Sequence, residues 1–214
     1  CRDPLSLHDA LPISFAASAT DGTRTRAWVF GGTRSDGSGV PMSEMWEFGA
    51  AVEEGGVGEG EWGMWRGEGG PPPMWEGTAV MMNDARGRPV IYLVGGVQSV
   101  DGVQFLASLA EVWVFTPSST LGGGTWSTVA LSGAPVGRRG HVAVGFDGNI
   151  WIQGGRSLDG TEVWSDSALL DVSTGSWTAT SEGEQVWGHL AVVLGETVLM
   201  AFGEFSLELC EAIR

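Results

Sequence analysis

The sequence predicts an all-β fold built from repeated four-stranded antiparallel sheets. Of its 214 residues, 35 are glycine and 11 are tryptophan. Glycine-rich turns between many short apolar runs are typical of all-β proteins, and the lack of a regular Gly-X-Y period excludes collagen. One apolar run ending in paired glycines also recurs along the chain, which indicates that a single structural unit is repeated.

The repeat is anchored on that glycine pair. Three copies stand at 27–32, 91–96 and 150–155, and a degenerate fourth stands at 199–204. Each of the first three is followed by a polar loop, a second strand-like run and a turn that leads to a tryptophan. Each later copy is preceded by one more apolar run, at 77–80, 140–144 and 188–192. Four short strands per unit, with glycine and aromatic residues at recurring places, predict the stacked blades of a β-propeller.

The order Arg-Gly-His-x-Ala-Val, strand, Gly-Gly, acidic-x-Trp-x-Phe, turn, Trp resembles the kelch repeat. Residues 138–177 follow this order almost throughout, and residues 74–126 follow it well. The first unit departs from it because its opening strand is reduced to 15–20, and the last unit stops after its second strand. The resemblance implies an all-β, kelch-type β-propeller that is incomplete, with about 3.5 four-stranded antiparallel blades. Such a fragment is expected to leave one blade face exposed and its strand edges unpaired.

We expect the chain to be one truncated propeller domain that follows a short artefact at its start. Leu5 to Ile13 match the translated tail of a widely used sequencing adapter, so we exclude the first fourteen residues from the fold. The expected segments are 1–14 for the adapter-derived artefact, 15–66 for a partial first blade, 67–130 for the second blade, 131–180 for the third blade and 181–214 for a partial fourth blade.

Recurring residues have structural roles in this interpretation. Inner strands buried on both faces lose alternation, glycine pairs allow close backbone approach, and tryptophans wedge between blades. His141 and His189 are an alternative pair of metal ligands, but their equivalent places in successive blades favour a structural role. The structural repeat positions are Gly31, Gly32, Trp46, Gly95, Gly96, Trp113, Trp126, His141, Gly154, Gly155, Trp177, His189 and Gly203.

The loops carry the functional prediction. Antiparallel strands place alternate loops on opposite faces, so the second-to-third and fourth-to-first connections should share one face. Polar, arginine-bearing loops on a rigid rim suit recognition of a protein or peptide. The candidate partner-binding residues are Arg34, Asp36, Gln98, Asp101, Arg138, Arg139, Arg156 and Asp159. The segment Gly49 to Gly63, rich in Gly, Glu and Ala, is expected to be a flexible acidic insertion on the other face.

Charge and composition narrow the classes of partner. The formal net charge of −15 argues against binding to nucleic acid or to an anionic membrane surface. The two cysteines, Cys1 and Cys210, form no disulfide framework or Cys-x-x-Cys pair, which favours an intracellular location. We expect no metal and no cofactor.

The sequence therefore favours a non-enzymatic scaffold for protein–protein interaction. The alternative is a fragment of a kelch-propeller enzyme, resembling galactose oxidase or an iron-dependent specifier, whose catalytic residues lie outside this chain. The copper site that the first resemblance implies needs two tyrosines, whereas this sequence has only Tyr92.

Overall fold

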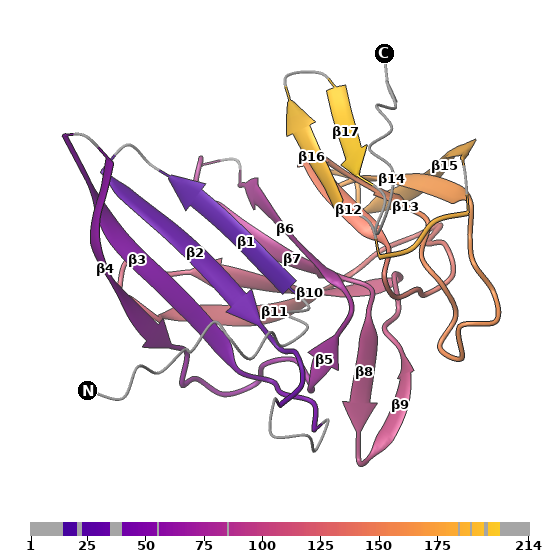
Figure 1. Ribbon diagram of the computed structural model, residues 1–214, viewed down its shortest axis with the longest axis horizontal. Coiled ribbons are helices and arrows are strands. Elements are labelled where there is room, and N and C mark those ends of the chain that lie inside the picture. Colours follow the sequence, from indigo (N-terminus) through magenta and orange to yellow (C-terminus); the bar gives the residue numbers. More distant parts are fainter. Residues whose placement is uncertain are drawn as a thin grey trace.

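The computed structural model describes residues 15–20, 23–34, 40–54, 56–84, 86–183, 185–188, 190–194 and 197–201. These residues form an all-β structure with several four-stranded antiparallel sheets, which confirms the all-β part of the expected fold class (Figure 1). None of them forms a helix with the length and apolar character needed to cross a membrane.

Each four-stranded sheet is a meander whose strands pair in chain order. The first sheet contains β1 (Phe15–Thr20), β2 (Arg24–Phe30), β3 (Met45–Glu53) and β4 (Gly56–Met64). The second contains β6 (Thr78–Asn83), β7 (Pro89–Val94), β10 (Glu111–Pro117) and β11 (Gly124–Ala130). The third contains β12 (Val142–Phe146), β13 (Asn149–Gln153), β14 (Asp166–Asp171) and β15 (Ser176–Glu182). A fourth, two-stranded sheet pairs β16 (Leu190–Leu194) with β17 (Thr197–Ala201).

A small extra sheet interrupts the second meander. It pairs β5 (Met74–Trp75) with β8 (Val97–Val100), and β8 with β9 (Val103–Leu106). The β8–β9 hairpin turns at Asp101 and Gly102, both of which have positive φ angles, of 51° and 78°. That geometry matches the tight two-residue turn that follows the twist of paired strands.

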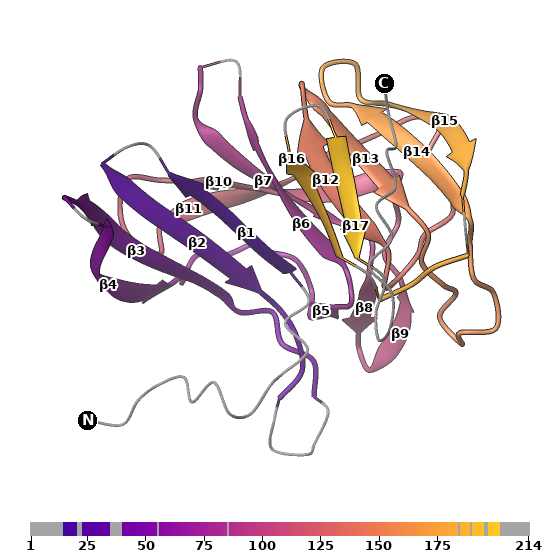
Figure 2. The same cartoon turned by 45° about the horizontal axis from the view of Figure 1, so that its top comes forward.

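The first strands of successive sheets lie side by side. β1 packs against β6, β6 against β12, and β12 against β16, and Figure 2 shows the sheets following one another in that order. At one of these contacts Gly145 of β12 faces Val80 and Met82 of β6, where a larger side chain would collide with both. Successive sheets therefore meet face to face, with their first strands adjacent.

The third sheet shows why its second strand lacks alternation. Ile150, Trp151, Ile152 and Gln153 are all buried. Ile150 and Ile152 pack into the core shared with the second sheet, whereas Trp151 packs into the core shared with the fourth sheet. A strand covered on both faces has no solvated side for polar residues, which explains the continuous apolar run.

The glycine pairs stand where the second strand ends and the chain approaches its neighbour. Gly31, Gly32, Gly95, Gly96, Gly154 and Gly155 all have positive φ angles, between 60° and 98°. At Gly95 a Cβ atom would lie 2.5 Å from the imidazole Cε1 atom of His141 and 2.7 Å from the carbonyl oxygen of Arg138. Both the backbone conformation and the space therefore require glycine.

The segment Gly49 to Gly63 corrects a sequence-based expectation. The composition indicates a flexible loop there, but the described residues extend β3 and β4 into a paired hairpin. Phe48 lies over Gly60, where any side chain would collide with its ring, and packs against Trp62 at a tilt, with 5.3 Å between ring centroids. Glycine in β4 therefore accommodates an aromatic ring instead of breaking the strand.

Candidate partner-binding site on the loop face

Backbone hydrogen bonds join the two kinds of connection that the sequence assigned to one face. The second glycine of each pair donates its N–H to a carbonyl of the next fourth-to-first connection. The three bonds run from Gly32 to Met74 (2.9 Å), from Gly96 to Arg138 (2.7 Å) and from Gly155 to Val186 (2.8 Å). We define the loop face as the described residues of 31–44, 65–77, 95–110, 131–141, 154–165 and 183–188.

A second chain of bonds runs across the fourth-to-first connections. Gly140 donates its N–H to the carbonyl of Glu76, and Gly188 donates to that of Gly140. These three residues therefore occupy equivalent places, and their φ angles are 54° for Glu76, 63° for Gly140 and 68° for Gly188. The sequence pattern instead aligns Gly77 with the two glycines. Glu76 thus holds a backbone conformation that favours glycine, and such strain is often found at functional positions.

Arg138 is buried, with 1% of its side chain exposed, so it is not presented to a partner as the sequence suggested. Its guanidinium donates to both carboxylate oxygens of Asp166, at 2.8 and 2.9 Å. It also donates to the carbonyls of Val136 and Gly154 and lies over the ring of Trp164. Because this bidentate pair satisfies the buried cation, Arg138 ties two connections together. These hydrogen bonds and the charge of Arg138 lower the pKa of Asp166, although partial burial opposes them.

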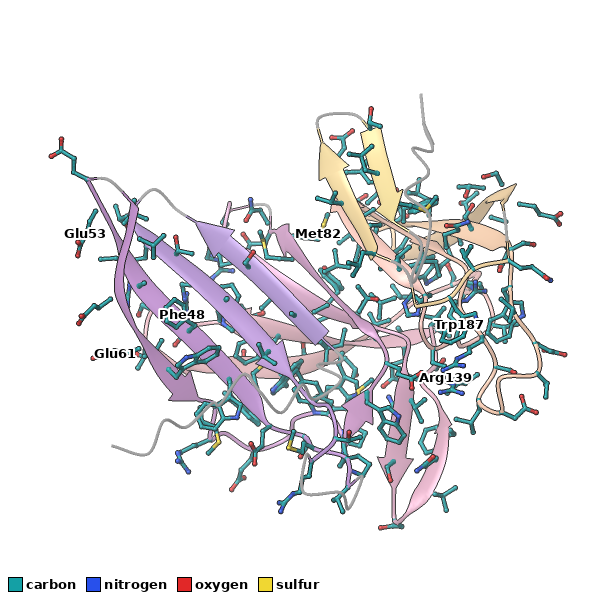
Figure 3. The ribbon with its side chains drawn as sticks, in the orientation of Figure 1. Phe48, Glu53, Glu61, Met82, Arg139 and Trp187 are labelled. Carbon is teal, nitrogen blue, oxygen red and sulfur yellow. The ribbon has the colours of Figure 1, made fainter. Side chains whose placement is uncertain are left out.

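Arg139 and Arg156 form the charged centre of the loop face. The Nη1 atom of Arg139 donates to both carboxylate oxygens of Glu76, at 3.1 and 2.8 Å. The Nη2 atom of Arg156 lies 3.6 Å from the same carboxylate, so two cations share one anion. The guanidinium of Arg156 also stacks 3.8 Å from the ring centroid of Trp187, which is 50% exposed. Figure 3 labels Arg139 and Trp187 on the side of the molecule away from Glu53 and Glu61.

Asp159 shapes the loop that borders these arginines. Its Oδ1 atom accepts hydrogen bonds from the hydroxyls of Ser157 and Thr161 and from the N–H of Thr161. The bonds from Ser157, followed by those from Thr161, lower the pKa of Asp159 to about 2. A carboxylate held within its own loop fixes the backbone shape.

The other candidate partner residues are separate from this centre. Arg34 is exposed, and its backbone N–H donates to the carbonyl of Val40. Gln98 and Asp101 belong to the β8–β9 hairpin, where Gln98 contacts the sulfur of Met74 at 3.9 Å. Among the described residues, neither Gln98 nor Asp101 forms an ion pair or hydrogen bond with Arg139 or Arg156. Asp36 lies outside the described residues, as do the repeat positions His189 and Gly203 and the segment 1–14.

Trp113, Trp126, Trp177 and His141 lie in or beside the sheet interfaces. Trp113 and Trp126 meet at 6.4 Å between ring centroids, and the buried Trp177 donates its indole N–H to the carbonyl of Leu109. Trp46 is half-buried and donates to Glu44. His141 is buried, and its carbonyl accepts a hydrogen bond from Thr78. Within the described part of the chain, no group of three or more His, Cys, Asp or Glu residues gathers in a metal-binding arrangement.

Sequence reasoning did not single out Glu76, Trp164 or Trp187, which complete the arginine surroundings. No sequence signal marks Glu76, because the sequence pattern aligns Gly77 with the later glycines, and only the backbone hydrogen bonds reveal that Glu76 is equivalent to Gly140 and Gly188. The two tryptophans carry no signal either, since each stands in a connection whose sequence varies between units.

Comparisons with known proteins show the fold and not a family. No protein-family model matches the chain, and no curated protein matches it. The chain is similar to a chain in the cryo-EM structure of RAG in complex with one melted RSS and one unmelted RSS, with a TM-score of 0.64 and 17% identity over 89% of this chain and 57% of that chain. It is also similar to the structure of YjhT, with a TM-score of 0.60 and 16% identity over 89% of this chain and 58% of that chain. The chain thus spans a little more than half the length of these similar chains, and the likeness establishes a shared all-β fold.

Proposed function

We propose that the chain is part of a kelch-type β-propeller and serves as a non-enzymatic scaffold that binds a protein or peptide on its loop face. Three features support the propeller assignment: the repeated glycine pairs, the four-stranded meanders and the side-by-side arrangement of their first strands. Connections of propeller blades vary while the blades hold them rigidly, so they are suited to recognition.

The observation that carries this proposal is the group formed by Arg139, Arg156 and Trp187. Arginine and tryptophan are the residue types most enriched among side chains that dominate binding energy at interfaces. Here the two arginine side chains keep 16% and 22% of their surface, and Trp187 keeps 50%. Their positions are fixed before binding by Glu76 and by the backbone bonds between connections. Preorganised side chains lose less conformational freedom on binding, which favours affinity.

Affinity capture of partners with charge-reversal variants tests the proposed face. The double variant Arg34→Glu, Arg156→Glu alters the loop face, and the single charge reversal Arg86→Glu is the control at the exposed turn between β6 and β7, on the opposite face. We expect the double variant to lose partners that Arg86→Glu retains, with unchanged far-UV circular dichroism in both. Loss of the same partners in Arg86→Glu, or their retention in the double variant, would contradict the proposal.

The enzyme alternative stays a hypothesis about residues outside this chain. The complex with RSS is a property of the RAG structure alone. Separately, the net charge of −15 disfavours a nucleic-acid partner for this chain. An intracellular location also stays a prediction.

A further inference from the structure

Two guanidinium groups converge beside a glycine of the loop face. Arg139 uses its Nη1 atom on Glu76 and its Nε atom on the carbonyl of Ser157. The Nη2 atom of Arg139 and the Nη1 atom of Arg156 point elsewhere, and they lie 3.7 and 3.8 Å from the position that a Cβ atom on Gly160 would occupy. Neither atom makes a hydrogen bond to the described residues.

Among the described residues, the carboxylates near this corner leave two guanidinium edges without a partner. Arg139 and Arg156 share the single carboxylate of Glu76, and the nearby carboxylate of Asp159 forms no ion pair with either arginine within the described chain. The Nε atom of Arg156 is buried and has no hydrogen-bond partner among the described residues. Stacking on Trp187 holds that guanidinium in place while its Nη1 edge faces Gly160. An added anion would therefore meet two oriented donors.

The loop that carries Gly160 is fixed in shape without using these donors. Gly160 donates its N–H to the carbonyl of Ser157 at 3.0 Å. The backbone N–H of Glu162 donates to the hydroxyl of Ser157, also at 3.0 Å. The Oδ1 atom of Asp159 holds Ser157 and Thr161, and within the described chain no ion pair joins Asp159 to either arginine. Because Gly160 has no side chain and a φ angle of 75°, the corner beside it stays open.

We propose that the Nη2 atom of Arg139 and the Nη1 atom of Arg156 form a subsite for one carboxylate, supplied by an acidic side chain of the partner. This proposal rests on the proposed function and adds the chemistry that the partner must carry. A carboxylate has two oxygens, one for each guanidinium edge, and Trp187 offers an apolar surface for the rest of the bound segment. The subsite gives a role to the two guanidinium nitrogens that Glu76 does not contact.

Titration of the full chain with N-acetyl-glutamate amide tests the subsite without a partner. The readout is the NMR signal of each arginine Nε–H group, with inorganic phosphate as a second probe. We expect saturable shifts for Arg139 and Arg156, and no saturable shift for the exposed Arg34. Arg156→Gln should weaken the binding about fivefold or more, since one charge-assisted donor is lost. Equal, non-saturable shifts at all arginines would overturn the proposal, and so would saturation by phosphate with none by the glutamate probe.

A pair of substitutions at Gly160 gives a sharper test that leaves both arginines in place. Aspartate and asparagine are the non-glycine residues that best tolerate positive φ angles, so both variants should keep the loop. Gly160→Asp places a carboxylate inside the chain next to the two guanidinium groups and should abolish the titration. Gly160→Asn has the same shape without the charge and should keep more binding than Gly160→Asp. Equal titration of the two variants would overturn the proposal.

The two proposals can fail independently. Saturable binding of the glutamate probe combined with unchanged partner capture by Arg34→Glu, Arg156→Glu would support the subsite and contradict the proposed function. Loss of partner capture in that variant without any binding of the glutamate probe would support the loop face and overturn the carboxylate subsite.

Discussion

Three tryptophans occupy one register position and have different surroundings. Trp62 pairs with Phe48, Trp126 with Phe115 and Trp177 with Leu170, each across the third and fourth strands of its sheet. Trp177 is 6% exposed, whereas Trp62 is 40% exposed. Trp126 is covered by Phe30 and Trp65 of the first unit, and Trp177 by Leu109 of the second. No described sheet packs against Trp62.

The difference shows that stacking between sheets, and not the sheet itself, makes the core. An outer strand with the same residue in the same register is buried only where another sheet precedes it. The other end of the described stack behaves alike, since Leu190 and Val192 of β16 are 74% and 52% exposed.

The largest expected effect separates Trp177 from Trp62. Trp177→Ala should lower the free energy of unfolding by about 3–5 kcal/mol, because it opens a cavity between two sheets and leaves the carbonyl of Leu109 without its donor. Trp62→Ala should lower it by about 1 kcal/mol or less, because the ring is already partly solvated. Urea denaturation of both variants measures the difference. Equal losses would show that stacking does not determine burial.

The junction at Arg138 is polar where the equivalent places are apolar. The carbonyls of Met74, Arg138 and Val186 accept the same repeated bond from a second glycine. Arg138→Met should nevertheless destabilise the chain by about 2 kcal/mol, since Asp166, Val136 and Gly154 lose a donor. We place the value below that of a fully buried pair because Asp166 is 44% exposed. If Arg138→Met is as stable as the native chain, methionine can fill the place of Arg138 as well as it fills the equivalent place of Met74.

Glu76 can be compared with Gly140 and Gly188 by substitution. Glu76→Gly relieves the positive φ angle, worth about 1 kcal/mol, and removes the half-buried ion pairs, worth a similar amount. Glu76→Gln removes the ion pairs without relieving the backbone. Thermal denaturation should therefore show the glycine variant to be the more stable of the two by about 1 kcal/mol. The reverse order would indicate that the glutamate side chain is not strained there.

The smallest effect concerns pH. Because Arg138 lowers the pKa of Asp166 in the folded chain, this ion pair contributes stability above the ordinary carboxyl pKa of about 3.9 and loses it as the pH falls through the lowered value. Stability profiles between about pH 2 and pH 6 should therefore be flatter in Asp166→Asn than in the native chain. Asp171→Asn should also flatten the profile, because hydrogen bonds from Ser173 and Thr174 within a solvent-exposed turn lower the pKa of Asp171, so it serves as a comparison without a buried cation. A steeper loss in Asp166→Asn would contradict this account.

The sequence predicted the strands of the repeated four-stranded sheets and their order, because glycine pairs and apolar runs report local conformation directly, but it did not predict the extra sheet of β5, β8 and β9. The unbroken apolar run Ile150, Trp151 and Ile152 even indicated burial on both faces of its strand. The β3–β4 hairpin was missed because its many glycines suggest flexibility, whereas Gly60 in fact makes room for the ring of Phe48. Arg138 and Arg139 stand side by side in the sequence, yet Arg138 is fully buried and Arg139 is only half-buried. That separation depends on Asp166 and Glu76, which lie 28 and 63 positions away.

Site-specific photo-crosslinking tests the central claim, that a partner binds the loop face, most directly. A photoreactive residue at Leu158 stands on the loop face beside the arginine pair, and one at Ser173 stands in the β14–β15 turn at the other end of the same sheet. The account predicts crosslinks to a partner from position 158 and none from position 173. Crosslinks from position 173 alone would contradict it.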